Sequence, residues 1–203
     1  MMPELVYPLI GFAAGSVPCS YLAARFLAGK DVRREGSGNV GATNVFRVAG
    51  RTAGIAAAAG DVLKSLLPVI LARIAGIPPA WQAATAAAVV AGHCYTPFLR
   101  FHGGKGVIST ITVALVLCWP AAIAFGVVWL GVFFAAGYVS LASILGAFAL
   151  PVVSALVRAD RSITVFFLLA PLFVLFKHRA NVRRLLEGTE SRMRRKAGVE
   201  HNP

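Results

Sequence analysis

The sequence has few acidic residues and few charges of any kind. Only 14% of its 203 residues are charged, and Asp and Glu together number 8. A soluble domain of this length usually has about 25% charged residues. The scarcity of charge, combined with 58% hydrophobic residues, excludes an ordinary soluble fold. It also excludes a disordered chain, which requires low hydrophobicity and high charge.

Cysteine is also scarce, and its spacing fits neither a disulfide framework nor a zinc site. The three cysteines are Cys19, Cys94 and Cys118, and no two of them form a C-x-x-C pair. An odd number without paired spacing argues against both kinds of site. Because His and carboxylate residues do not cluster with ligand spacing either, we expect no bound metal.

The sequence instead contains long apolar runs of the length that crosses a membrane. A spanning helix needs about 20 consecutive apolar residues. We predict one span in each of four segments: Leu5–Ala24, Thr52–Ala72, Ile74–Leu99 and the shorter Ser162–Phe176.

A fifth apolar segment, Gly106–Val157, is too long for one span. It has 52 residues and no charge. As one helix it would extend about 78 Å, at about 1.5 Å per residue, against a hydrocarbon core of about 30 Å. Pro and Gly interrupt helices, so we predict breaks at Trp119-Pro120 and Gly137-Tyr138.

The basic residues predict the number and direction of the spans. Fifteen of the 20 lie in Ala28–Arg51, Arg100–Lys105 and the tail from Lys177. The positive-inside rule places all three segments in the cytoplasm, so an even number of spans separates Lys105 from Lys177. Gly106–Val157 then holds three spans. The predicted fold is an all-α integral membrane protein with seven transmembrane helices, an outside N-terminus and a cytoplasmic C-terminus.

We expect residues 1–203 to form a single transmembrane domain that ends in a basic, disordered cytoplasmic tail at about 191–203. The formal net charge is +12, which in a soluble protein would suggest nucleic acid. In a membrane protein it indicates a basic cytoplasmic face whose partner is anionic lipid or a phosphorylated substrate, with no nucleic acid.

The first cytoplasmic loop is too polar to be a simple linker. The segment Gly36–Asn44 contains glycine, serine, asparagine and threonine, and Arg47 follows it. Glycine-rich backbone forms anion-binding nests, and arginine can bind phosphate through two hydrogen bonds. The loop is not a Walker motif, because Gly41 is followed by Ala42-Thr43. The alternative is a flexible turn between spans.

The second cytoplasmic loop, Phe101–Val107, combines Lys105 with three glycines at a predicted helix start. A helix N-terminus offers free N–H groups and a positive dipole end, and both favour an anion. Alternatively, Lys105 serves only as a charge that orients the span.

Asp61 and Lys64 lie three residues apart within a predicted span. Each costs about 3 kcal/mol near the bilayer centre, so both are expected to face the protein interior. Either they form a salt bridge that locks helices together, or Lys64 reaches a bound phosphate.

The segment Lys177–Glu190 places His178 and Asn181 on one face of a predicted interfacial helix. A basic stop-transfer tail would explain the arginines there but not these two residues. His93 lies at the end of a predicted span, where a hydrogen-bonded core histidine is the alternative to a catalytic base.

Motifs in one order along the chain resemble those of a known family. They are Gly15-Ser16 with Pro18, Gly36-Ser37-Gly38-Asn39 with Gly41-Ala42-Thr43-Asn44 and Arg47, Gly92-His93 with Pro97-Phe98, Gly103-Gly104-Lys105-Gly106-Val107, Tyr138–Ser143, and His178-Arg179 with Asn181 and Arg184-Leu185. The chain resembles the bacterial acyl-phosphate:glycerol-3-phosphate acyltransferases from Gly15 to Glu190.

The resemblance implies transfer of a fatty acyl group from acyl phosphate to the 1-hydroxyl of glycerol 3-phosphate. The products are lysophosphatidic acid and phosphate, in the first acylation step of bacterial phospholipid synthesis. It also implies seven spans in the bacterial inner membrane, an active site facing the cytoplasm, no cofactor and no metal. The expected partners are membrane lipid, the two substrates and a soluble enzyme that forms acyl phosphate.

The expected site residues come from the resemblance and from the two loops. The resemblance assigns glycerol 3-phosphate binding to Ser37, Arg47, Lys105, His178 and Asn181, with Ser143 lining the site. Of these, Arg47, Lys105, His178 and Asn181 are the predicted catalytic residues. Further predicted substrate-binding residues are Gly38, Asn39, Thr43, Asn44, Lys64, His93, Gly103 and Gly104.

Two questions of mechanism stay open in the sequence. The chain lacks the His-x4-Asp motif of acyltransferases that use acyl-CoA or acyl carrier protein, which favours acyl phosphate as the donor. The glycerol hydroxyl proton is accepted by a phosphate oxygen of the substrate, which we favour, or by His178 or His93. A transporter of phosphorylated metabolites is the alternative function.

Overall fold

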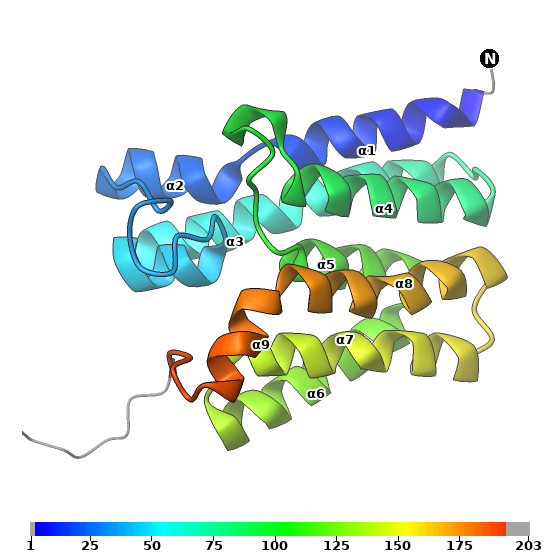
Figure 1. Ribbon diagram of the computed structural model, residues 1–203. Helices are drawn as coiled ribbons and strands as arrows, with labels where there is room; N and C mark the ends of the chain where they lie inside the picture. Colours follow the sequence, from blue (N-terminus) through cyan, green and yellow to red (C-terminus); the bar gives the residue numbers. More distant parts are fainter. Residues whose placement is uncertain (1–2, 194–203) are drawn as a thin grey trace, which may run out of the picture.

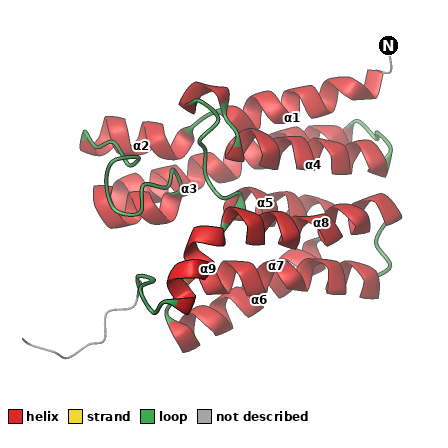
Figure 2. Ribbon diagram, viewed as in Figure 1, coloured by secondary structure: helices red, strands yellow, loops and turns green. Residues whose placement is uncertain are grey.

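The computed structural model describes residues 3–193, and all regular structure within them is helical (Figure 2). The elements are a 3₁₀ turn at Pro3–Leu5, α1 (Val6–Ser16), α2 (Cys19–Ala28), α3 (Ala42–Ile74), α4 (Pro79–Cys94), a second 3₁₀ turn at Pro97–Leu99, α5 (Val107–Leu117), α6 (Trp119–Ala136), α7 (Val139–Leu156), α8 (Arg161–Lys177) and α9 (Arg179–Leu186).

The first predicted span is a broken helix. The sequence predicted one uninterrupted segment over Leu5–Ala24, but the chain leaves helical geometry at Val17, where ψ is 119°, and resumes at α2. Pro18 explains the break, since proline has no backbone N–H and disfavours helical geometry in the residue before it.

The second predicted span starts ten residues earlier than the sequence suggested. Helix α3 has 33 residues and begins directly after the first glycine-rich loop. Gly50 interrupts it with a φ of 85°, a left-handed value that favours glycine. The N-terminal turns of α3 therefore point in a different direction from the rest of the helix.

The two breaks predicted inside the long apolar segment are confirmed. Helix α5 ends at Leu117, and α6 begins at Trp119 with proline in its first turn. Helix α6 ends at Ala136, and Gly137 has a φ of 78° before α7 begins. The segment folds into three helices as expected, although α5 has only 11 residues.

The outer surface of the helices is apolar, as in a membrane protein. Exposed side chains include Leu9, Phe26, Leu63, Val127 and Leu168. Within residues 3–193, four helical segments are long and apolar enough to cross a membrane, and a fifth is added if α8 and α9, bent by 61°, form one span. The bundle thus has the composition and surface of an integral membrane protein.

The helices form two groups with a gap between them at one end (Figure 1). Helices α1 and α4 pack side by side, α2 packs on α3, and α6, α7 and α8 pack in succession. Helix α5 contacts α3, α4 and α6, and so joins the two groups. The loop between α2 and α3 lies at the same end of the bundle as α9.

The end of the described chain folds back onto this end of the bundle. The backbone N–H of Met193 donates to the carbonyl of Gly137 at 3.0 Å. Residues 191–193, the first part of the tail predicted to be disordered over about 191–203, therefore follow a defined path. Residues 194–203 lie outside the described part.

Glycines allow close packing of α1 against α4. A Cβ on Gly15 would overlap the backbone carbonyl of Val89, and one on Gly92 would overlap that of Phe12. Small residues spaced four apart, here Gly11 and Gly15, allow helices to approach closely in membranes, where packing rather than the hydrophobic effect drives association.

We expect Gly15→Ala to destabilise the bundle. The added methyl group must separate the α1 and α4 backbones, and such overpacking costs about 1–3 kcal/mol. Thermal unfolding in detergent measures the effect. Gly131→Ala is the matched control, since no atom lies within 4 Å of the added Cβ in α6. Equal melting temperatures for both variants would contradict the close packing.

Candidate active site

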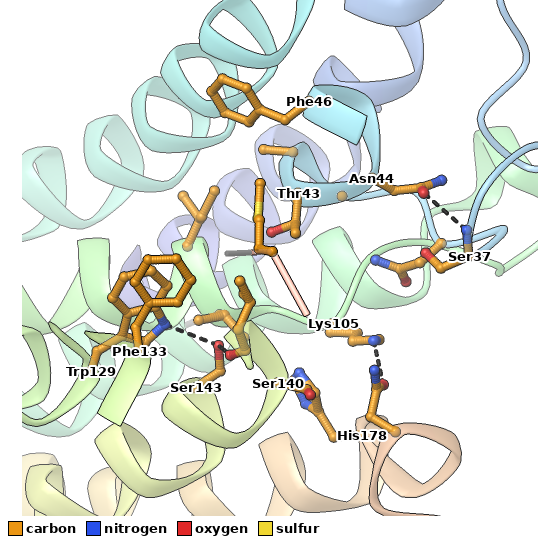
Figure 3. Close-up of a pocket in the computed structure, with 18 of the residues that line it drawn as sticks. Ser37, Thr43, Asn44, Phe46, Lys105, Trp129, Phe133, Ser140, Ser143 and His178 are labelled. Carbon is orange, nitrogen blue, oxygen red and sulfur yellow. Dashed lines mark hydrogen bonds between the residues drawn. The ribbon is translucent and has the colours of Figure 1, made fainter. Parts of the chain in front are cut away.

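A cavity of about 610 Å³ opens where the two helix groups separate. One end is polar and contains Lys105 and His178, whereas the other is apolar and contains Trp129 and Phe133 (Figure 3). Asn181 belongs to the polar end, since it accepts a hydrogen bond from Lys105. Residues from six helices (α3, α4, α5, α6, α7 and α9) and two glycine-rich loops line it. The cavity is therefore suited to a ligand with a polar and an apolar part.

Asn44 fixes the shape of the first glycine-rich loop. Its side-chain nitrogen donates to the carbonyls of Val32 and Glu35, each at 3.0 Å, and its oxygen accepts from the backbone N–H of Ser37 at 3.0 Å. Gly36 has a φ of 62°, and a Cβ there would overlap the Asn44 side chain. Asn44 thus holds the loop that carries Ser37 to the cavity (Figure 3).

Three helices begin at the cavity. Its lining includes Thr43 in the first turn of α3, Val107 at the start of α5, and Val139 and Ser140 at the start of α7. The first N–H groups of a helix have no intrahelical partner, and the dipole is positive at this end. Three such ends around one cavity favour a bound anion.

Two cations line the cavity without a carboxylate partner. Within residues 3–193, neither Arg47 nor Lys105 forms an ion pair. Lys105 Nζ instead donates to Asn181 Oδ1 at 2.5 Å. Burial lowers the pKa of Lys105 from 10.5 to about 8, with Glu190 opposing the shift and neighbouring cations adding to it. A bound anion would supply the missing countercharge.

Glu190 fixes the positions of polar side chains at the polar end of the cavity. Its Oε1 accepts from Asn181 Nδ2 at 2.6 Å and from Ser140 Oγ at 2.7 Å, and its Oε2 accepts from Arg184 Nε at 2.7 Å. Burial raises the pKa of Glu190, but these hydrogen bonds lower it more, and the net shift is downward. The carboxylate therefore stays charged and orients the Asn181 amide toward Lys105.

The orientation of His178 follows from its own helix. Its Nδ1 lies 2.8 Å from the carbonyl of Val174, which can only accept a hydrogen bond. Nδ1 therefore carries the proton of the neutral ring, and Nε2 is left as an acceptor. His178 is buried and lines the cavity beside Lys105 (Figure 3).

The apolar end is built mainly by α6. Trp129 and Phe133 stack with ring centroids 5.0 Å apart, and Trp129 Nε1 donates to Ser143 Oγ at 3.2 Å. Phe125 and Gly126 line the cavity one turn further along α6 toward its start. A Cβ on Gly126 would meet no atom within 4 Å, so this turn borders open space.

Comparison with known proteins identifies the family. The family model for glycerol-3-phosphate acyltransferase matches residues 5–188. The chain belongs to the glycerol-3-phosphate acyltransferase family. A glycerol-3-phosphate acyltransferase of Geobacter sulfurreducens is 42% identical over 96% of this chain and 100% of its own length, and one of Desulforudis audaxviator is 43% identical over 90% and 92%.

Solved structures agree with this assignment. The crystal structure of PlsY (YgiH), described as an integral membrane glycerol 3-phosphate acyltransferase, is similar in its glycerol 3-phosphate form with a TM-score of 0.89. It is 33% identical, and the match covers 94% of this chain and 96% of that chain. The lysophosphatidic acid form matches with a TM-score of 0.86. The resemblance seen in the sequence is therefore confirmed.

The acyltransferase fold brings most of the predicted residues together. Ten line the cavity: Ser37, Asn39, Thr43, Asn44, Arg47, His93, Lys105, Ser143, His178 and Asn181. Lys64, Gly103 and Gly104 instead line a much smaller cavity of about 10 Å³ behind the second loop, which His93 also borders. Gly38 lines neither cavity.

Sequence reasoning missed Glu190 and the apolar wall of α6. Glu190 lies at the end of the resemblance, and two of its partners, Ser140 and Asn181, reach it only through the fold. Phe125, Trp129 and Phe133 occur in an uninterrupted apolar run in which no periodicity separates lipid-facing from cavity-facing positions. That these three side chains line the cavity is clear only from the fold, in which α3 and α6 contribute to the same cavity.

We expect anion binding to weaken as the pH rises through about 8, because Lys105 then loses its charge. Sulfate is a suitable probe, since its charge is constant in this range. With a pKa of about 8, the charged fraction of Lys105, and with it the affinity, should fall about tenfold between pH 7 and pH 9.

The control is Lys105→Arg, which keeps its charge throughout this range. Calorimetric titration of the purified protein in detergent should give a nearly constant dissociation constant for this variant. An equal pH dependence in the wild type and in Lys105→Arg would assign the effect to another group.

Proposed function

We propose that this protein transfers a fatty acyl group from acyl phosphate to the 1-hydroxyl of glycerol 3-phosphate, releasing lysophosphatidic acid and phosphate. One observation carries the proposal: a single cavity combines Arg47 and Lys105, which form no ion pair with a carboxylate within residues 3–193, with an apolar end walled by aromatic rings. Membership in the acyltransferase family and the likeness to PlsY support it.

The polar end fits the acceptor. Arg47 and Lys105 supply positive charge, and the N-termini of α3 and α5 supply N–H donors for a phosphate group. His178 Nε2 and the amide of Asn181 lie beside Lys105 and would orient the glycerol hydroxyl groups. Ser37, Asn39, Thr43 and Ser143 add short polar side chains to the lining.

The apolar end fits the acyl chain. Phe125, Gly126, Trp129 and Phe133 continue the cavity along α6 away from the cations. A fatty chain placed there leaves the reactive carbonyl at the boundary between the two ends. The acyl phosphate group then meets the same cations as the acceptor, and positioning with charge stabilisation supplies most of the rate acceleration.

The chemistry needs no covalent intermediate on the protein. The acceptor oxygen bonds to the acyl carbon, the bond from that carbon to the phosphate oxygen breaks, and phosphate leaves with the electron pair. We assign the hydroxyl proton to a phosphate oxygen of the substrate, with His178 and Asn181 in an orienting role. His178 Nε2, free to accept, is the alternative acceptor of that proton.

The proposed setting is the bacterial inner membrane, crossed seven times, with the N-terminus outside and the active site facing the cytoplasm. The basic loop between α2 and α3 and the basic helix α9 lie at the same end of the bundle, which supports this orientation (Figure 1). A soluble enzyme that forms acyl phosphate would deliver the donor from that side.

An assay in detergent tests the reaction directly. The purified protein should release phosphate from palmitoyl phosphate only when glycerol 3-phosphate is present, without any sealed compartment. Arg47→Ala should lose more than about tenfold in kcat/KM, because a charge-assisted hydrogen bond contributes about 1.5–3 kcal/mol.

Arg51→Ala is the matched control, since Arg51 is exposed one turn further along α3 and does not line the cavity. Turnover with acyl-CoA alone would contradict the donor. Transport into vesicles without phosphate release would favour the alternative of a carrier for phosphorylated metabolites.

Gly126 should limit the length of the acyl chain. Gly126→Leu fills the open space at the deepest turn of α6 that lines the cavity. Overpacking costs about 1–3 kcal/mol, so kcat/KM for palmitoyl phosphate should fall about tenfold or more relative to octanoyl phosphate. Gly131→Leu also enters open space but lies outside the cavity lining, and should leave this ratio unchanged. If the ratio of kcat/KM for palmitoyl phosphate to that for octanoyl phosphate were equal in both variants, the acyl chain would have to bind elsewhere.

A further inference from the structure

Three titratable side chains form a cluster that the proposed chemistry does not use. Asp61, Lys64 and His93 are 1%, 8% and 6% exposed, and they lie between α2, α3 and α4 behind the second glycine-rich loop. Asp61 and His93 also border the main cavity. Such groups are costly within a membrane and generally mark a functional or structural requirement.

Asp61 and Lys64 stabilise the break between α1 and α2. Lys64 Nζ lies 2.9 Å from Asp61 Oδ1 and donates to the backbone carbonyl of Val17 at 2.7 Å, and Ser20 Oγ donates to Asp61 Oδ2 at 2.7 Å. A broken helix leaves carbonyls that need partners when no water is present. The salt-bridge alternative for this pair is therefore confirmed.

His93 connects this ion pair to the second loop. Its Nδ1 lies 3.7 Å from Asp61 Oδ1, and its Nε2 lies directly under Gly104, where a Cβ would overlap it. The N–H groups of Gly103 and Gly104 donate to the carbonyls of Cys94 and His93, each at 3.2 Å. Neither glycine has a positive φ, so close approach to His93 is what requires glycine here.

The other side of the loop is also held. Arg100 and Phe101 have φ values of 52° and 62°, which are rare for residues other than glycine. The Phe101 N–H donates to the Thr96 carbonyl at 2.9 Å, and Thr96 Oγ1 donates to the Ser16 carbonyl at 2.5 Å, at the break after α1. The loop is therefore tied to that break on both sides and ends at Lys105.

We propose that His93 is a positioning residue. Its Nδ1 faces the Asp61 carboxylate at 3.7 Å, and its ring supports the Gly103–Gly104 backbone and thereby sets the place of the Lys105 ammonium group in the cavity. His93 acts on the substrate phosphate through Lys105 rather than by contact. This inference rests on the proposed function, because turnover of a phosphorylated substrate is its readout.

A double-mutant cycle tests the route through Lys105. His93→Gln should lower kcat/KM for glycerol 3-phosphate about tenfold in the wild type, and less than about twofold in a Lys105→Ala background. Thr85→Val is the control for disturbing a buried polar residue of α4, since Thr85 donates only to the Trp81 carbonyl of its own helix. Its effect on kcat/KM should be small in both backgrounds.

A second cycle separates positioning from direct contact and does not alter the ring. Gly104→Ala removes no polar group but pushes the loop away from His93, so it should reproduce the loss and also add little to Lys105→Ala. It replaces the first cycle if His93→Gln does not purify. The proposal would be overturned if, in either cycle, the fold-loss in kcat/KM of the double variant equals the product of the losses of the two single variants.

The two hypotheses fail in different ways. A wild type that is inactive with acyl phosphate but active with another acyl donor refutes the proposed donor, and the cycles can then be run with that donor. Normal wild-type activity with multiplicative losses refutes only the role of His93.

Discussion

The Lys64 ammonium group sits where the first transmembrane segment breaks, between the Val17 carbonyl and the Asp61 carboxylate. Without it, a helix broken inside the bundle would leave a polar backbone group unpaired in an apolar environment. The pair thus allows α2 to diverge from the line of α1, and α2 packs on α3 and ends before the first glycine-rich loop. The polar end of the cavity is built on this junction.

Charge is distributed unevenly around the cavity. Glu190 is surrounded by donors from Ser140, Asn181 and Arg184, whereas Arg47 and Lys105 have no carboxylate partner within residues 3–193. Burial disfavours the charged form of Lys105, and this cost lowers its pKa to about 8. The Lys105 ammonium group also lies in the same cavity as the positive N-terminal ends of α3, α5 and α7. Positive groups gathered in this way are favourable only when an anion is bound between them.

The sequence predicted the breaks at Trp119-Pro120 and Gly137-Tyr138, since Pro and positive-φ glycine act locally. It did not predict the break at Pro18, because Leu5–Ala24 has no charge and was interpreted as one continuous span. Ser37, Lys105, His178 and Asn181 were assigned through the family resemblance, and all four line the cavity. The apolar wall of α6 and the roles of Gly103 and Gly104 could not be predicted. They depend on which parts of the fold face α6 and the second glycine-rich loop.

The cavity draws its lining from positions as far apart as Ser37 and Met193. Synthesis on the ribosome proceeds from the N-terminus, and α9 with Glu190 emerges last. A nascent chain that has inserted only its first helices therefore has the anion-binding loops without His178, Asn181 or Glu190. The site is complete only when membrane insertion is complete, so partly inserted chains lack the assembled polar end of the cavity.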